Sequence, residues 1–245
     1  MQRMKLCILE NDVVDPAVSP SYGSYGAMVD RLLRSVGAHW HTEIFCTSLG
    51  QFPSSYTPYD AVLLTGSRAD SFSQEAWVVQ LREHVHHLLQ IQKKLLGICF
   101  GHQLIALCLG ARVGRAPQGW GLGRMIYQWH APEWITHTES AHLKLASQVA
   151  LLASHQDQVF DLPAGASLLA SNSFCPIAAF AVGRHVFCVQ AHPEFVADYS
   201  AYLLDKRRTS LLEDHYAASR SSLIDGHDGM HLARMMVAFV ESTID

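Results

Sequence analysis

The pentapeptide GICFG at positions 97–101 constrains the fold of this 245-residue chain more than any other feature. It follows a short apolar run at 94–98 and precedes a helical pattern at 102–109, so it predicts a sharp turn between a buried strand and a helix. Glycines two positions before and after Cys99 leave room where strand and helix touch. The pattern is typical of a nucleophile elbow, which holds a reactive side chain at the carboxyl edge of a parallel sheet.

The first 110 residues alternate between strand-like and helix-like patterns. Further short apolar runs lie at 5–9, 41–46 and 61–65, and amphipathic helical patterns lie at about 26–37 and 73–91, the second with Ser73 as a candidate N-cap. Alternation of this kind predicts a parallel sheet built from strand–helix–strand units.

The second half of the chain does not alternate strand and helix patterns in this way. Short strand candidates lie at 125–129, 147–152, 167–170, 178–182 and 186–190, and the chain becomes helical from Ala197. We expect the charged stretch 203–222 to be a solvated helix face and a last helix at about 230–243 to pack back onto the fold. The prediction is one domain over 1–245, with a core at about 5–200 and a helical extension at about 200–245. Its fold class is α/β: an open, mostly parallel central sheet flanked by helices, with a small antiparallel portion.

Composition excludes several classes of protein. Hydrophobic residues make up 49% of the chain and charged residues 16%, which argues against disorder. A net charge of -4 provides no basic surface for nucleic acid, and no apolar run approaches the roughly 18 residues of a membrane span. Six cysteines without a CxxC pair indicate a reducing compartment. We therefore expect a cytoplasmic protein that binds neither nucleic acid nor membrane.

A cysteine nucleophile needs a base, and the chain offers fifteen histidines. His192 is favoured because it directly follows a strand candidate and precedes Pro193 and Glu194. The proline fixes the backbone, and the carboxylate is placed to orient the imidazole. At the elbow, the start of the following helix favours negative charge on the Cys99 sulfur, and the backbone N–H of Phe100 becomes a candidate oxyanion donor.

The segments GICFGHQ at 97–103 and HPEF at 192–195 together resemble the class I glutamine amidotransferase family, over roughly residues 5–200. The likeness is greatest to stand-alone chains similar to the glutaminase part of GMP synthase, and it implies that the predicted α/β fold is flavodoxin-like. The resemblance implies a catalytic triad of Cys99, His192 and Glu194 that attacks the side-chain amide of glutamine or a related γ-glutamyl amide. A γ-glutamyl thioester then forms, and water hydrolyses it with release of ammonia or an amine.

Other positions carry roles that the resemblance implies. Gly66 and Ser67 correspond to a glycine loop that supplies an oxyanion donor alongside Phe100, although many relatives have two glycines there. A second departure is Gly121, where many relatives carry an acidic residue. Gln103 corresponds to a glutamine that helps form the substrate pocket.

The segment Ser154-His155-Gln156-Asp157 resembles a stretch that lies beside the bound substrate in the family. His155 and Asp157 are therefore candidate substrate-binding residues. The alternative is that they are loop residues with local hydrogen bonds.

Three functional hypotheses stay open. The chain is a free-standing γ-glutamyl peptidase or amidase, a glutaminase that passes ammonia to a separate synthase subunit in trans, or a non-catalytic binding relative. A cysteine hydrolase of an ester or peptide is a further variant, since a fold does not fix a substrate. The pair His227 and His231 lacks the glutamate and third ligand of a zinc site, so we expect no metal ion and no cofactor.

Overall fold

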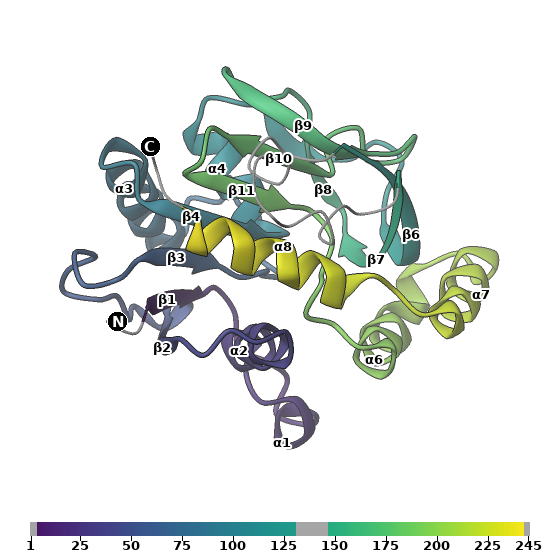
Figure 1. Cartoon of the computed structure of the whole chain (residues 1–245). Coiled ribbons are helices and arrows are strands. Elements are labelled where there is room, and N and C mark those ends of the chain that lie inside the picture. The colour runs from purple at the N-terminus through teal and green to yellow at the C-terminus, as the bar shows by residue number, and fades with distance from the viewer. Residues whose placement is uncertain (1–3, 131–146, 243–245) are drawn as a thin grey trace.

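The computed structural model describes residues 4–130 and 147–242. Within them a nine-stranded sheet runs through the centre of the molecule (Figure 1) in the order β2-β1-β3-β4-β11-β10-β9-β6-β7. Its first five strands are mutually parallel and its last four are antiparallel. The parallel strands are β2 (His41–Cys46), β1 (Lys5–Glu10), β3 (Ala61–Leu64), β4 (Lys94–Ile98) and β11 (Val186–Val189). The antiparallel strands are β10 (Ala179–Val182), β9 (Ala166–Ser171), β6 (Gly121–Trp129) and β7 (Gln148–His155).

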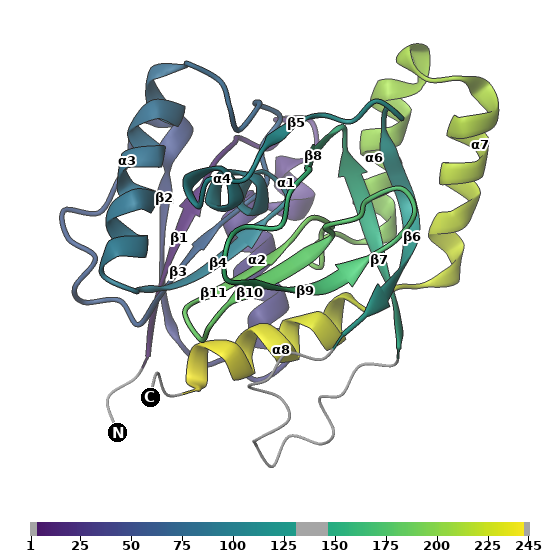
Figure 2. The same cartoon turned by 90° about the horizontal axis from the view of Figure 1, so that it is seen from above.

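Helices cover both faces of the parallel strands, as the continuous apolar runs require. Leu6 and Ile8 of β1 belong to one core cluster with the buried sides of α2 (Tyr25–Ser35) and α8 (Gly229–Glu241). Cys7 and Leu9 alternate to the other face, in the cluster of α3 (Ala76–Gln90) and α4 (Phe100–Cys108). Figure 2 shows α3 and α4 on the opposite side of the sheet from α2 and α8. The predicted fold class is confirmed.

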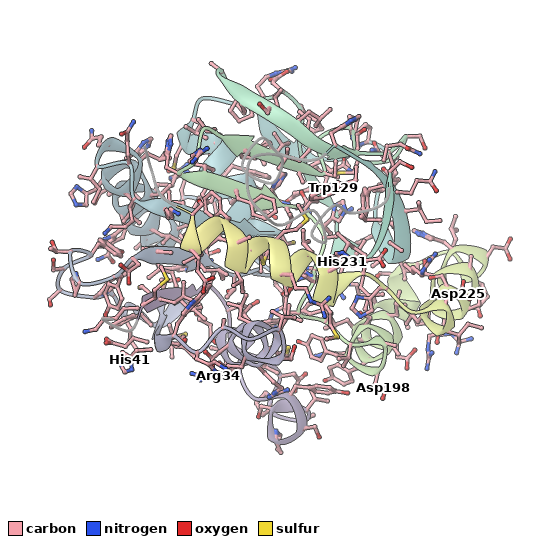
Figure 3. All side chains as sticks on the ribbon, viewed as in Figure 1. Arg34, His41, Trp129, Asp198, Asp225 and His231 are labelled. Carbon is pink, nitrogen blue, oxygen red and sulfur yellow. The ribbon has the colours of Figure 1, made fainter. Side chains whose placement is uncertain are left out.

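The C-terminal segment consists of α6 (Ala197–Arg207), α7 (Glu213–Ser221) and α8, with short 3₁₀ turns at Arg208–Ser210 and Ser222–Asp225. As expected, α8 packs back onto the sheet. Trp129 at the end of β6 shares its core cluster, and Figure 3 shows the side chains crowded between α8, which carries His231, and the strands. The predicted end of this helix at Thr243 lies outside the described residues.

Several boundaries differ from the sequence prediction. The helix expected from Ser73 begins at Ala76, because the Ser73 hydroxyl accepts a hydrogen bond from the backbone N–H of Glu75 at 3.1 Å and forms a turn there. A short α1 (Ser19–Tyr22), which was not predicted, lies between β1 and α2. Two short strands, β5 (Val113–Arg115) and β8 (Asp157–Val159), were not predicted, and they pair with each other in a separate small sheet.

Two glycines allow β4 and α4 to approach closely. A methyl group on Gly97 would lie 2.8 Å from the backbone of Gly101, and one on Gly101 would lie 2.5 Å from the carbonyl oxygen of Leu64 on β3. Backbone atoms cannot move aside as a flexible side chain does, so these positions accept only glycine without a shift of the strand or the helix.

We expect Gly101→Ala to reduce the free energy of unfolding by about 1–3 kcal/mol, the usual cost of forcing an extra methyl into a packed interior. Thermal unfolding measures the change. Gly114→Ala is the matched control, because its methyl would meet only the ring of Phe160, at 3.2 Å, on a partly exposed side chain. Equal melting temperatures for Gly101→Ala and the parent chain would contradict the proposed close approach.

Candidate active site

Cys99 lies between the end of β4 and the start of α4, with φ 52° and ψ −102°. A positive φ is unfavourable for a residue with a β-carbon, and such backbone strain concentrates at functional sites. The chain tolerates it here because strand and helix are packed together on either side. Cys99 is largely buried, and its backbone carbonyl accepts a hydrogen bond from the N–H of Gln103 at 3.0 Å in the first turn of α4. This is the elbow that the sequence predicted.

His192 and Glu194 follow β11, which pairs with β4 in parallel. The carboxyl ends of the two strands therefore meet at one edge of the sheet, and the His192 ring lies beside the Cys99 side chain. Glu194 Oε1 lies 2.8 Å from His192 Nδ1, and the ring of Phe195 stacks on the imidazole with centroids 3.9 Å apart. The backbone N–H of His192 donates to the carbonyl of Leu152 at 2.8 Å. The ring is thus held on several sides.

Electrostatics favour the charged form of His192. Burial by itself disfavours the imidazolium, but the negative charges of Glu194 and Cys99 and hydrogen bonds to both outweigh it and raise the pKa of His192 to about 10. The charged imidazole lies between the Glu194 carboxylate and the Cys99 side chain, an arrangement in which a histidine can activate a cysteine.

Gly66 follows β3 and lies against the same two side chains. A methyl group on Gly66 would lie 2.8 Å from the His192 ring and 3.6 Å from the β-carbon of Cys99. The loop at Gly66 and Ser67 therefore lies directly beside the Cys99 and His192 side chains. Phe100 begins α4, where helix N–H groups lack partners within the helix.

A cavity of about 250 Å³ contains the Cys99 side chain. Its wall includes the segments that follow β3 and β4. The β7–β8 turn and helix α6 also contribute to it. Its lining residues are Ser67, Arg68, Ala69, Asp70, Cys99, Gln103, Arg115, Trp120, Ser154, His155, Gln156, Asp157 and Arg207. The cavity thus contains all three residues that the sequence predicted for substrate binding.

Gln103 and His155 are buried at the cavity wall. The Gln103 amide donates to the Asp157 carbonyl at 2.9 Å and to Gln190 Oε1 at 3.2 Å, so it also connects α4 to the strands. Burial lowers the pKa of His155 to about 4, and the ring is neutral at pH 7. Its Nδ1 lies 3.2 Å from the Asp157 carbonyl and must be the donor, which makes Nε2 an acceptor; Nε2 is buried without a partner among the described residues.

Gly121, where many relatives carry an acidic residue, lies too close to its neighbours for a side chain. A methyl group on it would lie 2.7 Å from the ring of Phe174 and 3.0 Å from His155 Nε2. Because position 121 is glycine, no carboxylate from this position lies next to the His155 ring.

Asp157 belongs to a charge cluster in the cavity. Burial and a hydrogen bond to Asp70 raise the pKa of Asp157 to about 6, against the opposing effect of Arg115. Arg115 binds both carboxylates, with a nitrogen 3.1 Å from Asp157 and another 3.0 Å from Asp70. Perturbed carboxyl groups of this kind cluster at functional sites.

Apart from Asp157, sequence reasoning missed the charged residues that line the cavity around Cys99. Asp70 lies only three residues after Ser67, which is a signal that the loop motif offered, and Arg115 lies on an unpredicted strand. Arg207 was included in a stretch expected to be a solvated helix face, but it is partly buried and lines the cavity. Helical periodicity could not identify it, because the cavity lies where α6 meets loops distant in sequence.

Two further findings concern only the described residues. They contain no group of three His, Cys, Asp or Glu side chains arranged to hold a metal ion. None of their helices is long and apolar enough to cross a membrane.

The fold and the site define the class of protein: an α/β enzyme whose candidate nucleophile lies at the carboxyl edge of a parallel sheet. The model of the family "Glutamine amidotransferase class-I" matches residues 18–206. A "Gamma-glutamyl peptidase 3" of Arabidopsis thaliana is 31% identical over 211 residues, covering 85% of this chain and 84% of that protein. A "GMP synthase [glutamine-hydrolyzing]" of Aeropyrum pernix is 32% identical over 174 residues, which are 70% of this chain and 31% of the synthase.

A solved glutamine amidotransferase from Thermotoga maritima superposes with a TM-score of 0.76 at 17% identity, covering 99% of this chain and 100% of that chain. The chain belongs to the class I glutamine amidotransferase family and is a hydrolase-type enzyme of that family. The resemblance stated from the motifs is confirmed.

Proposed function

We propose that the chain is a cysteine-dependent hydrolase of γ-glutamyl amides, with Cys99, His192 and Glu194 as its triad. The observation that carries the proposal is the left-handed backbone at Cys99, which presents the sulfur to an imidazole held by Glu194 at 2.8 Å. The similarity to a γ-glutamyl peptidase over 85% of the chain supports the substrate class.

The reaction has two halves. The Cys99 thiolate attacks the γ-carbonyl carbon, and His192 gives its proton to the amide nitrogen as the C–N bond breaks, so ammonia or an amine leaves. His192, now neutral, removes a proton from water, and the resulting hydroxide attacks the γ-glutamyl thioester. The C–S bond then breaks, glutamate leaves, and Cys99 is again a thiolate beside an imidazolium. Glu194 stabilises the imidazolium in both stages.

The negative oxygen of each tetrahedral intermediate needs donors. We assign these to the backbone N–H of Phe100 at the start of α4 and to the loop of Gly66 and Ser67. Helix N–H groups at this position have no partner within the helix, and the dipole of α4 favours negative charge there.

Three residues are proposed to hold the γ-glutamyl group. The Asp157 carboxylate, next to Asp70, suits the substrate's α-ammonium, and the His155 ring lines the same wall. Gln103 lines the cavity and fixes the backbone of Asp157.

A second candidate function is a glutaminase that supplies ammonia to a separate synthase subunit. The likeness to part of a GMP synthase favours it, because that match covers only 31% of the synthase. A non-catalytic binding relative is a third alternative, which the presence of Cys99, His192 and Glu194 at one site opposes. We further propose that the chain is a single domain that acts in the reducing cytoplasm, with its six cysteines as free thiols.

The direct test is release of amine or ammonia by the purified chain on γ-glutamyl dipeptides and on L-glutamine. We expect Cys99→Ala to reduce turnover by roughly a thousandfold or more, because the nucleophile is lost. Cys108→Ala, at the far end of the helix that follows Cys99 and outside the cavity, should retain activity. Turnover of glutamine alone would favour the synthase-subunit function, and full activity of Cys99→Ala would refute the proposed nucleophile.

The raised pKa of Asp157 predicts a pH dependence. Binding of an ammonium needs the carboxylate, so protonation of Asp157 should reduce kcat/KM as pH falls through about 6. Asp157→Asn should remove this inflection and raise KM. Asp161→Asn, which alters an exposed carboxylate paired with Arg112, is the control and should keep it. An unchanged inflection in Asp157→Asn would show that another group titrates.

A further inference from the structure

A second cavity, of about 190 Å³, lies next to the first. Arg68 and Arg207 line both cavities, so the two adjoin at these arginines. The second cavity lies where α6 meets α2, elements that are near each other in Figure 1 and in contact through aromatic rings. Its lining residues are Val13, Asp15, Tyr25, Arg68, Tyr199, Tyr202, Leu203, Lys206 and Arg207.

Three tyrosines form one wall of this cavity. The Tyr199 hydroxyl donates to the Tyr25 hydroxyl at 3.0 Å, and their rings meet edge to face with centroids 6.2 Å apart. The ring of Tyr202 lies 6.4 Å from that of Tyr199. Tyr25 and Tyr199 are buried and fixed in position, so they offer a preformed aromatic surface for another ring or a large apolar side chain.

The charges around the second cavity are paired, with one exception. Lys206 contacts Asp15, and Arg68 binds Asp12 through two nitrogens at 2.8 Å each. Arg207 has no carboxylate partner among the described residues.

Arg207 is nevertheless held in place. One nitrogen of its guanidinium donates to the Leu203 carbonyl at 3.1 Å, and the group lies over the Trp120 ring at 4.7 Å. A guanidinium has five N–H donors, so most remain available where the two cavities meet.

We propose that the second cavity binds the leaving group of the substrate: an amino acid with an aromatic or large apolar side chain, whose carboxylate pairs with Arg207. This inference rests on the proposed function. In a γ-glutamyl amino acid the carboxylate is attached to the carbon next to the scissile nitrogen, so it must lie near Cys99. Arg207 meets this requirement, because it lines the same cavity as Cys99. Its fork of donors matches a carboxylate.

Three substrates separate the contribution of the leaving group's ring from that of its carboxylate. γ-Glutamylphenylalanine has both the ring and the carboxylate, γ-glutamylphenethylamide has the ring alone, and L-glutamine has neither in its leaving group. All three share the same γ-glutamyl part. The test compares kcat and KM for each substrate with the parent chain, with Arg207→Leu and with Arg208→Leu. The last is the control, because Arg208 is the next residue, exposed, and paired with Glu213.

For Arg207→Leu we expect kcat/KM on γ-glutamylphenylalanine to fall about tenfold or more, mainly through KM, as loss of a charge-assisted contact predicts. The other two substrates should change by less than about twofold, and Arg208→Leu should match the parent chain. Tyr202→Leu should reduce the preference for γ-glutamylphenylalanine over γ-glutamylalanine. Equal losses on all three substrates would show that Arg207 binds the γ-glutamyl part and would overturn the proposal. No loss on any substrate would show that Arg207 binds neither the γ-glutamyl part nor the leaving group, and would also overturn it.

A binding measurement keeps this test independent of catalysis. Calorimetry of γ-glutamylphenylalanine with Cys99→Ala, and with Cys99→Ala combined with Arg207→Leu, reports on the subsite even if the parent chain hydrolyses nothing. Weaker binding only when Arg207 is replaced would support the subsite while the hydrolase proposal fails. Identical binding, with unchanged melting temperatures, would overturn the subsite.

Discussion

The backbone conformation of Cys99 is the constraint on which the rest of the site depends. A positive φ at a residue with a β-carbon costs on the order of 1–3 kcal/mol, and packing on both sides must hold it. Gly97 and Gly101 make that packing possible by letting β4 and α4 approach to backbone contact. The turn then projects the sulfur beyond the sheet edge, next to a histidine delivered by the neighbouring parallel strand.

The two halves of the chain contribute different parts of the site. Parallel strands β3, β4 and β11 position the loop at Gly66, Cys99 and His192 at one edge, where their carboxyl ends meet. The β7–β8 turn and helix α6 add charged walls that shape what can reach the sulfur. A site of this construction allows the walls to change while the side chains at the sheet edge stay in place, which is how one fold can serve different substrates.

The sequence predicted the parts of this structure that local patterns determine. Apolar runs bounded by turns identified the parallel strands, and the glycine spacing around Cys99 identified the elbow. The motif HPE placed His192 and Glu194 together, and the structure gives the distance between them. The short strands β5 and β8 were not predicted, because a segment of three residues is too short to show an alternating apolar pattern. Arg207 faces the cavity only through long-range packing, and no local pattern distinguishes it from a solvated surface charge.

The central claim is that Cys99 takes the γ-glutamyl group from the substrate. Mass spectrometry of the intact protein, quenched in acid during turnover of a γ-glutamyl dipeptide, tests it most directly. We expect a fraction of the chain to gain the mass of one γ-glutamyl group, and peptide mapping should place it on the segment that contains Cys99. Turnover without any such adduct, or an adduct on another residue, would contradict the account.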